Sequence, residues 1–126
     1  MACIYCNQNA DTMDHIVPIS YLSNRKTGRH SIGETIECCQ ECNSLLSNQL
    51  FDSIAERAMH INKRLKARYS RLINSQEWAQ YELKQMGPEM QQYIRETMKK
   101  KEIILSRIYH SKIVAGTKNY QQSLFP

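Results

Sequence analysis

Two Cys-x-x-Cys pairs constrain this 126-residue chain more than any other feature of its sequence. Cys3 and Cys6 form the first pair, and Cys39 and Cys42 form the second. Each such turn directs two sulfurs toward one point, and four thiolates suit a tetrahedral zinc ion. No thioredoxin-like βαβ pattern surrounds the pairs, so a redox role is the weaker interpretation. The spacing therefore predicts one structural zinc site.

The fifth cysteine, Cys38, stands directly before the second pair. It could replace Cys39 as a ligand in a Cys-x3-Cys pairing, but Cys39 repeats the spacing of the first pair and is the better candidate. We therefore expect Cys38 to be a small buried side chain rather than a ligand.

A metal would also supply stability that the first part of the chain lacks. Its first fifty residues contain few large apolar side chains, and so short a segment rarely builds its own core. We expect a zinc-bound unit over residues 1–52, a basic helical extension over residues 53–116 that packs on it or continues from it, and a loosely ordered tail over residues 117–126.

Charge is divided unevenly along the chain. Residues 1–52 carry three Lys or Arg against six Asp or Glu, a balance of −3, and residues 53–126 carry fourteen against six, a balance of +8, which together give the net charge of +5. The basic half favours DNA as a partner, although charge alone supports a solvated lysine-rich helix face about as well. The residues expected to contact DNA are Lys63, Arg64, Lys66, Arg68 and Arg71.

Targeting and membrane signals are not expected. No basic and apolar leader follows Met1, and no run approaches the ~20 apolar residues of a membrane span. We expect a cytoplasmic protein, in the host cytoplasm if a phage encodes it, without a membrane partner. A homodimer, or a place in a larger phage or restriction complex, stays open as an alternative to a monomer.

The pattern of apolar and turn-forming residues in the N-terminal part of the chain predicts two strands followed by a helix. The chain as a whole is expected to be a mostly helical α+β protein. Strands are expected over Thr12–Ile19 and Glu34–Cys38, with a loop over residues 20–33 between them. Apolar residues then recur at steps of three and four from the second cysteine pair to Leu72, which predicts one long helix.

Two more helices are expected, over residues 76–86 and from Pro88 to about Val114, because Gly87 and Pro88 form a stop and a start signal. The apolar face of the last helix is expected to contain Met90, Ile94, Met98, Leu105 and Ile108. Trp78, Tyr81 and Tyr93 could stack on bases, but at helical spacing we expect them in the core.

Three side chains near the cysteines are suited to metal-assisted hydrolysis. Imidazole titrates near neutral pH, so His15 could activate a water molecule. Oxygen atoms of Asp14 and Asn43 could hold a hard divalent ion, which acts as a Lewis acid. Adjacent residues of a regular strand point to opposite faces, so a bend or bulge at Asp14-His15 is expected if both serve one site.

Together these motifs resemble the HNH endonuclease superfamily, which has the ββα-metal fold. The motifs that carry the resemblance are Cys3-x2-Cys6, Asp14-His15-Ile16-Val17-Pro18 and Cys39-x2-Cys42-Asn43. An Asn directly after the last cysteine is similar to the His-Asn-Asn variants and to junction resolvases of the phage endonuclease VII type. The resemblance covers residues 3 to about 50, and the rest of the chain carries no family motif.

The resemblance implies a metal-dependent DNA endonuclease. His15 would be the general base that activates water, and Asp14 and Asn43 would hold one Mg²⁺ or another divalent ion at the scissile phosphate. The four paired cysteines would bind a structural Zn²⁺ that takes no part in the chemistry. The products would carry 5′-phosphate and 3′-hydroxyl ends.

Two positions depart from the family pattern. Glu34 stands where many members have an Asn that braces the loop over the site, and Leu46 stands where many have a Lys. No recognition module is visible, so nicking or double-strand cleavage of low sequence specificity is expected. A resolvase specific for branched DNA, and a non-catalytic zinc-stabilised nucleic-acid-binding module, stay open as alternatives.

Overall fold

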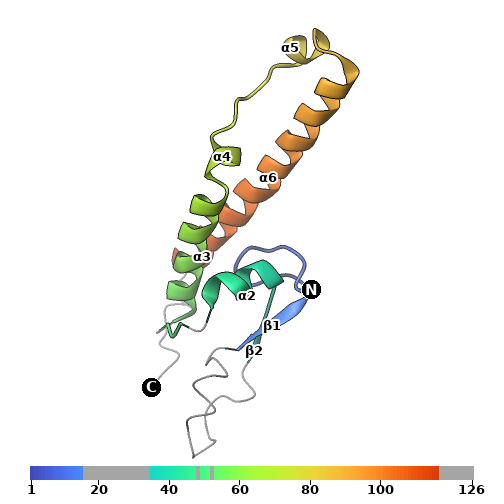
Figure 1. Ribbon diagram of the computed structural model, residues 1–126. Helices are drawn as coiled ribbons and strands as arrows, with labels where there is room; N and C mark the ends of the chain where they lie inside the picture. Colours follow the sequence, from blue (N-terminus) through green and yellow to red (C-terminus); the bar gives the residue numbers. More distant parts are fainter. Residues whose placement is uncertain (16–34, 48, 52, 117–126) are drawn as a thin grey trace, which may run out of the picture.

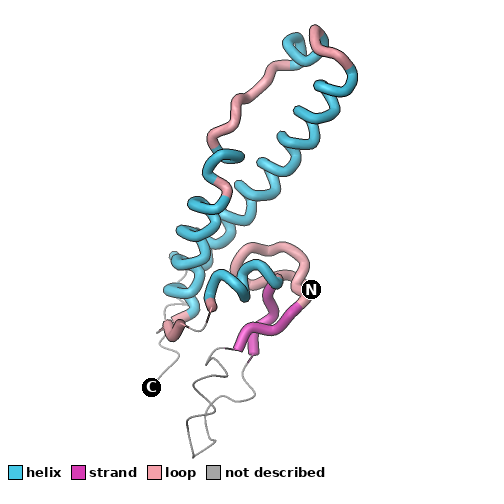
Figure 2. Tube along the Cα trace, in the orientation of Figure 1, coloured by secondary structure: helices cyan, strands magenta, loops and turns pink. Residues whose placement is uncertain are grey.

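The computed structural model describes residues 1–15, 35–47, 49–51 and 53–116, and the side chain of His15 lies outside the described part. The described chain is mostly helical and contains one two-stranded antiparallel sheet, which confirms the predicted α+β class (Figures 1 and 2). No helix among these residues is both long enough and apolar enough to cross a membrane.

Two short strands pair near the N-terminus. β1 covers Thr12–His15 and β2 covers Thr35–Cys38. They pair antiparallel in consecutive register, from Thr12 opposite Cys38 to His15 opposite Thr35. The continuation of the first strand to Ile19, the loop over residues 20–33 and Glu34 lie outside the described residues.

The single long helix predicted from the second cysteine pair to Leu72 is wrong, because the described residues of this stretch form three separate helices. They are α2 over Gln40–Leu46, α3 over Ile54–Arg68 and α4 over Ser70–Ile73. Ser47 follows α2 with a φ of 55°, a left-handed value through which a right-handed helix does not continue. The Ser53 hydroxyl then accepts a hydrogen bond from the backbone N–H of Glu56 at 3.1 Å, which caps the start of α3.

The last helix, α6, covers Pro88–Gly116 and confirms the prediction of a helix from Pro88 to about Val114. Its 29 residues span about 43 Å at 1.5 Å per residue. It runs beside α3 and α4, and together these helices form an arm. Figure 1 shows the far end of this helical arm, near α5, pointing away from the sheet. The helix predicted over residues 76–86 is shorter, because α5 covers only Gln80–Lys84.

One apolar core joins the N-terminal cysteines to the helices. It contains residues from both of the parts predicted on either side of residue 52, so the sheet, α2, α3 and the second half of α6 are packed together. Its buried members are Cys3, Tyr5, Cys6, Cys38, Cys39, Cys42, Leu45, Leu46, Ala58, Ile61, Leu65, Ile104, Ile108 and Val114.

The outer half of the arm is less buried than the sequence predicts. Met90, expected on the apolar face of α6, is 53% exposed there. Leu105, also expected on that face but in the second half of the helix, is 42% exposed, and its neighbour Ile104 is buried in its place. Tyr81 and Tyr93, expected in the core, are also exposed. For the first turns of α6 the reason is that α3, the helix that packs most extensively on α6, ends at Arg68.

Candidate metal centre

The two cysteine pairs meet at one buried point between the first turn of the chain and the start of α2. The ligand atoms of Cys3, Cys6, Cys39 and Cys42 all lie within 4.8 Å of one another, and the sulfurs of Cys6 and Cys39 are 3.6 Å apart. A zinc ion with four bonds of about 2.3 Å places its sulfurs about 3.8 Å from each other. All four cysteines are free thiols, so the four of them could hold a structural metal such as zinc.

Local backbone geometry explains why the sulfurs converge. The N–H of Asn7 donates to the carbonyl of Cys3 at 2.9 Å, and Asn7 has a φ of 66°, a left-handed value that Asn tolerates better than most residues. In the second pair, Cys39 is the N-cap of α2, and its sulfur accepts a hydrogen bond from the backbone N–H of Cys42 at 3.4 Å. Each pair therefore forms a tight turn around its sulfurs.

The four sulfurs hold their protons unequally. Hydrogen bonds from Cys3 and Cys42 lower the pKa of Cys39 to about 6, and hydrogen bonds from Cys3, Cys39 and Cys42 also lower the pKa of Cys6. The pKa of Cys42 is raised, first by its hydrogen bond with Cys3. A cluster in which some thiols already tend toward thiolate is prepared to exchange the remaining protons for a divalent ion.

Cys38 is not part of this cluster. It is fully buried at the end of β2, and burial, with a smaller effect of Asp14, raises its pKa to about 12. At neutral pH it is therefore a protonated, apolar side chain in the core, in keeping with the choice of Cys39 as the ligand.

The second cysteine pair is surrounded by charged side chains from distant parts of the chain. Glu41, inside the pair, accepts hydrogen bonds from Arg68 at 2.9 Å and from the Tyr69 hydroxyl at 2.6 Å. Arg107 of α6 forms an ion pair with Glu41 at 2.6 Å and donates from Nη2 to the sulfur of Cys39 at 3.8 Å. Burial opposes the charge of Arg107, but Cys6 and Glu41 outweigh it, so its pKa is raised.

Asp14 is buried beneath the sheet rather than open to solvent. Its Oδ2 accepts a hydrogen bond from the Tyr5 hydroxyl at 2.9 Å and forms an ion pair with Arg57 of α3. Arg57 Nε also donates to the Tyr5 hydroxyl at 2.9 Å, and its guanidinium lies over the ring of Phe51, 5.6 Å from the centroid. Burial opposes the charge of Arg57, but Tyr5 and Asp14 outweigh it and raise its pKa.

His15 and Asn43 stand on two elements that pack against each other. His15 ends β1, next to Asp14, and Asn43 lies half-buried on α2 directly after Cys42. The strand register is consecutive over Thr12–His15, so the predicted bulge at Asp14-His15 is absent from the described strands. The sheet and α2 thus bring the two backbone segments together, while the His15 imidazole lies outside the described part.

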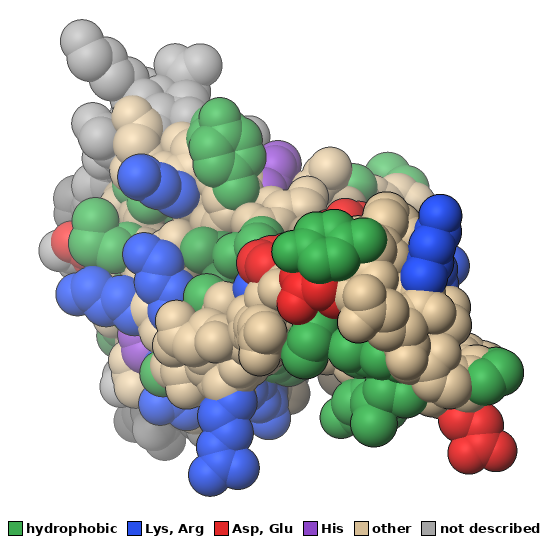
Figure 3. All heavy atoms as spheres, turned by 90° about the horizontal axis from the view of Figure 1, so that it is seen from above, with side chains coloured by type: hydrophobic (Ala, Val, Ile, Leu, Met, Phe, Trp, Pro, Cys, Tyr) green, Lys and Arg blue, Asp and Glu red, His purple; other side chains and the backbone are tan. Residues whose placement is uncertain are grey.

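The five basic residues expected to contact DNA are exposed but do not share one face. Arg64 and Arg68, one helical turn apart on α3, line an open pocket of about 440 Å³ together with Ser44, Leu45 and Ala67, which we call the α2–α3 pocket. Lys66 lines a different pocket, with Met59, Asn62, Lys112, Ala115 and Gly116. Seen from above, most of the visible Lys and Arg side chains lie toward the left of the molecule, and another group lies at its right edge (Figure 3).

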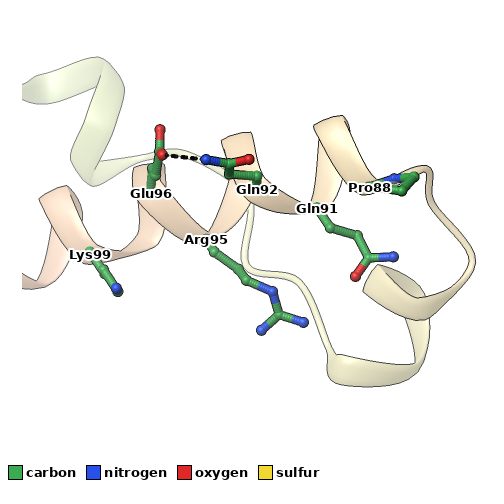
Figure 4. A pocket seen from close by; sticks show the side chains of 6 residues that line it. All are labelled: Pro88, Gln91, Gln92, Arg95, Glu96 and Lys99. Atoms are coloured by element: carbon green, nitrogen blue, oxygen red, sulfur yellow. Dashed lines mark hydrogen bonds between the residues drawn. The ribbon is translucent and has the colours of Figure 1, made fainter.

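A larger pocket, of about 520 Å³, lies on the outer part of α6 and is a poor candidate for a reaction site. Its walls come from successive turns of this one helix, and Gln92 donates a hydrogen bond to Glu96 at 3.2 Å within it (Figure 4). The side chains that line it are Pro88, Gln91, Gln92, Arg95, Glu96 and Lys99. It contains none of the residues that the sequence singles out for chemistry.

Sequence reasoning missed Arg57 and Arg107, the two buried arginines that hold Asp14 and the second cysteine pair. A signal was present for both: Arg57 lies three residues after Ile54 on the apolar stripe of α3, and Arg107 lies three residues after buried Ile104 on α6. A charged residue at a core position needs a partner. The identity of that partner depends on contacts across 43 and 68 residues.

Comparisons with protein-family models, with curated proteins and with solved structures found no match to this chain.

Proposed function

We propose that the protein is a metal-dependent endonuclease of the HNH type that hydrolyses phosphodiester bonds in DNA. The observation that carries the proposal is the order of β1, β2 and α2 around the four cysteines, with Asp14 and His15 consecutive in β1 and Asn43 directly after Cys42. α2 packs against β1, so the two segments that carry these residues are neighbours. This strand–strand–helix order is the one expected of the ββα-metal fold.

In this proposal, His15 is the general base. Its imidazole takes a proton from a water molecule, the water oxygen bonds to phosphorus, and the bond from phosphorus to the 3′ oxygen breaks. The departing 3′ oxygen takes up a proton from solvent, so the product ends are a 5′-phosphate and a 3′-hydroxyl. A divalent ion held by Asp14 and Asn43 would supply Lewis-acid stabilisation of the charge that develops on the phosphate oxygens.

The contacts of Asp14 limit how it would serve as a ligand. Tyr5 and Arg57 both bind Oδ2, and a carboxylate has a second oxygen with its own acceptor positions. We assign the metal contact to that second oxygen, with Arg57 and Tyr5 fixing the orientation of the carboxylate. Preorganisation of this kind is what a catalytic ligand requires.

The α2–α3 pocket supports a nucleic-acid substrate. Ser44, the residue after Asn43, lines it together with exposed Arg64 and Arg68. Arginine binds phosphate oxygens through two parallel N–H groups, and such contacts carry little base information. A DNA backbone seated there would lie next to the segment of α2 that carries Asn43, and cleavage of low sequence specificity follows.

The experiment is a cleavage assay of the zinc-loaded protein on supercoiled, linear and branched DNA, with Mg²⁺, Mn²⁺, Ni²⁺ or additional Zn²⁺. We expect nicking or linearisation with at least one of these ions and a loss of at least about 100-fold in His15→Ala, the usual size of a general-base contribution. Undiminished cleavage by His15→Ala, purified identically, would overturn the mechanism. A strong preference for the branched substrate would instead assign the protein to the resolvases.

A second candidate function is a zinc-stabilised nucleic-acid-binding module without catalysis. It is favoured by one observation, namely that Asp14 is only 3% exposed and already paired with a cation, Arg57. This candidate predicts DNA binding that weakens with salt, no cleavage with any of the four ions, and no effect of Asp14→Asn on DNA affinity. The same cleavage assay, run beside a binding titration, separates the two functions.

A further inference from the structure

Arg107 joins the helical arm to the second cysteine pair. It lies on α6, sixty-eight residues after Cys39, and is only 6% exposed. Its Nη2 is 3.8 Å from the Cys39 sulfur and its Nη1 is 2.6 Å from Glu41 Oε1. One guanidinium therefore bridges a candidate metal ligand and the carboxylate that sits between the two ligands of that pair.

The charges at this point require a buried cation once a metal is bound. A divalent ion with four thiolates carries a net charge of −2, and the carboxylate of Glu41 adds a further negative charge beside it. Buried charge is costly unless it is paired. Arg68 also contacts Glu41, but its side chain is 53% exposed and, within the described part of the chain, it bonds to Glu41 rather than to a cysteine sulfur, so it cannot take the place of Arg107 at Cys39.

The hydrogen bonds of the Arg107 guanidinium show which contacts hold this side chain in place. Among the described residues, Arg107 Nε is the buried side-chain polar atom without a hydrogen bond, whereas both terminal nitrogens point to the cysteine pair. α6 also reaches the first pair, because His110 Nε2 lies 3.1 Å from the carbonyl oxygen of Ile4. The helix is thus attached on both sides of the metal centre.

We propose that Arg107 is a positioning residue of the metal centre: it donates an N–H···S hydrogen bond to the Cys39 thiolate, offsets the negative charge of the four-thiolate site, and thereby couples metal retention to the docking of α6. The inference rests on metal binding by the four cysteines and not on phosphodiester hydrolysis. It predicts that the electronic state of one ligand sulfur depends on a residue of the last helix.

Cobalt substitution tests this coupling in the full chain. A hydrogen bond to a thiolate lowers the energy of the sulfur electrons, so its loss moves the thiolate-to-cobalt charge-transfer band to lower energy. We expect this shift in Arg107→Met and, in the zinc-loaded protein, transfer of zinc to an excess of chelator about tenfold faster or more. Arg68→Met is the matched control, because it removes the other arginine at Glu41 but leaves the sulfur contact; it should change neither readout.

A second variant controls for misfolding of Arg107→Met. Arg107→Met leaves Glu41 without its most buried partner, whereas the double variant Glu41→Gln/Arg107→Met removes both charges and should fold more readily. It is expected to show the same band shift and the same faster release. The proposal is overturned if both variants match Arg68→Met in band position and zinc release, or if the wild-type chain binds no cobalt through its cysteines.

Discussion

Arg57 of α3 forms a buried ion pair with Asp14 of β1, two residues that lie forty-three positions apart in the sequence. The side chains of both are almost fully shielded from solvent, at 2% and 4% exposure. Tyr5 completes the group, since its hydroxyl donates to Asp14 and accepts from Arg57. The pair therefore holds the sheet against α3. Asp14 thus has a structural role in addition to the metal-binding role proposed for it.

Arg57→Met should lower the free energy of unfolding of the zinc-loaded protein by about 3–5 kcal/mol, because it leaves the Asp14 carboxylate buried without its partner. The double variant Asp14→Asn/Arg57→Met should lose much less, since neither charge is then left unpaired. Urea denaturation followed by circular dichroism measures both, with exposed Arg95→Met as the control. A loss below about 1 kcal/mol in Arg57→Met, the range of ordinary surface substitutions, would contradict this role.

Cys39 and Cys38 should behave differently although they are neighbours. Cys39→Ala removes a predicted ligand and should lower the metal content well below one zinc per chain after dialysis. Cys38→Ala should keep one zinc per chain, because this thiol lies outside the four-sulfur cluster and its raised pKa of about 12 keeps it protonated at neutral pH. Mass spectrometry measures the zinc content of both variants. Loss of zinc from Cys38→Ala would show that Cys38 is a ligand and would contradict the assignment.

Arg64 and Lys66 should contribute unequally to DNA binding. Arg64 lines the α2–α3 pocket beside Ser44, whereas Lys66 lines a pocket with Lys112 near the end of α6. Arg64→Gln should weaken binding and reduce the slope of log affinity against log salt by about one, the effect of one lost phosphate contact. Lys66→Gln is the matched control and should leave the slope nearly unchanged. Equal effects of the two substitutions would place the DNA elsewhere.

Asn62 should stabilise the docking of α6 on α3. Its buried amide donates to the carbonyl of Ile108 at 3.0 Å and to the hydroxyl of Ser111 at 3.1 Å. Asn62→Ala should cost about 1–3 kcal/mol, the penalty for a buried polar partner that is lost. Hydrogen exchange should speed up around residues 108–111 and stay unchanged in α5. Uniform exchange across both segments would indicate a global rather than a local effect.

The cysteine cluster and α6 could be predicted from the sequence, because both depend on signals between residues that are close together in the chain. The cysteine cluster follows from two tight turns of fixed spacing, and α6 follows from a start signal at Pro88 and a long helical period. The break between α2 and α3 also had a signal, Ser53 three residues before Glu56, which is the pattern of a capped helix start. Apolar residues continue at helical spacing across that break, so the sequence was interpreted as one helix in spite of the capping signal.

The surroundings of the candidate site were not predictable, for a physical reason. The burial of Asp14 depends on Tyr5 and Arg57, and the environment of Cys39 depends on Arg107. These contacts form only when helices from the second half of the chain pack on the first. No local pattern encodes which arginine meets which acid, so sequence reasoning identified the candidate ligands but not the groups that hold them.

We propose two separate roles for metal, a structural one at the cysteines and a catalytic one at Asp14 and Asn43, and one chelation experiment tests that separation most directly. Zinc-loaded protein that cleaves DNA in Mg²⁺ is mixed briefly with EDTA, and cleavage, bound zinc and helical circular dichroism are followed together. We predict that cleavage stops at once and returns with excess Mg²⁺, while zinc and helix content stay constant because buried thiolates release zinc slowly. Cleavage that continues in EDTA with zinc still bound, helix content that falls in step with cleavage, or no cleavage before chelation would contradict the account.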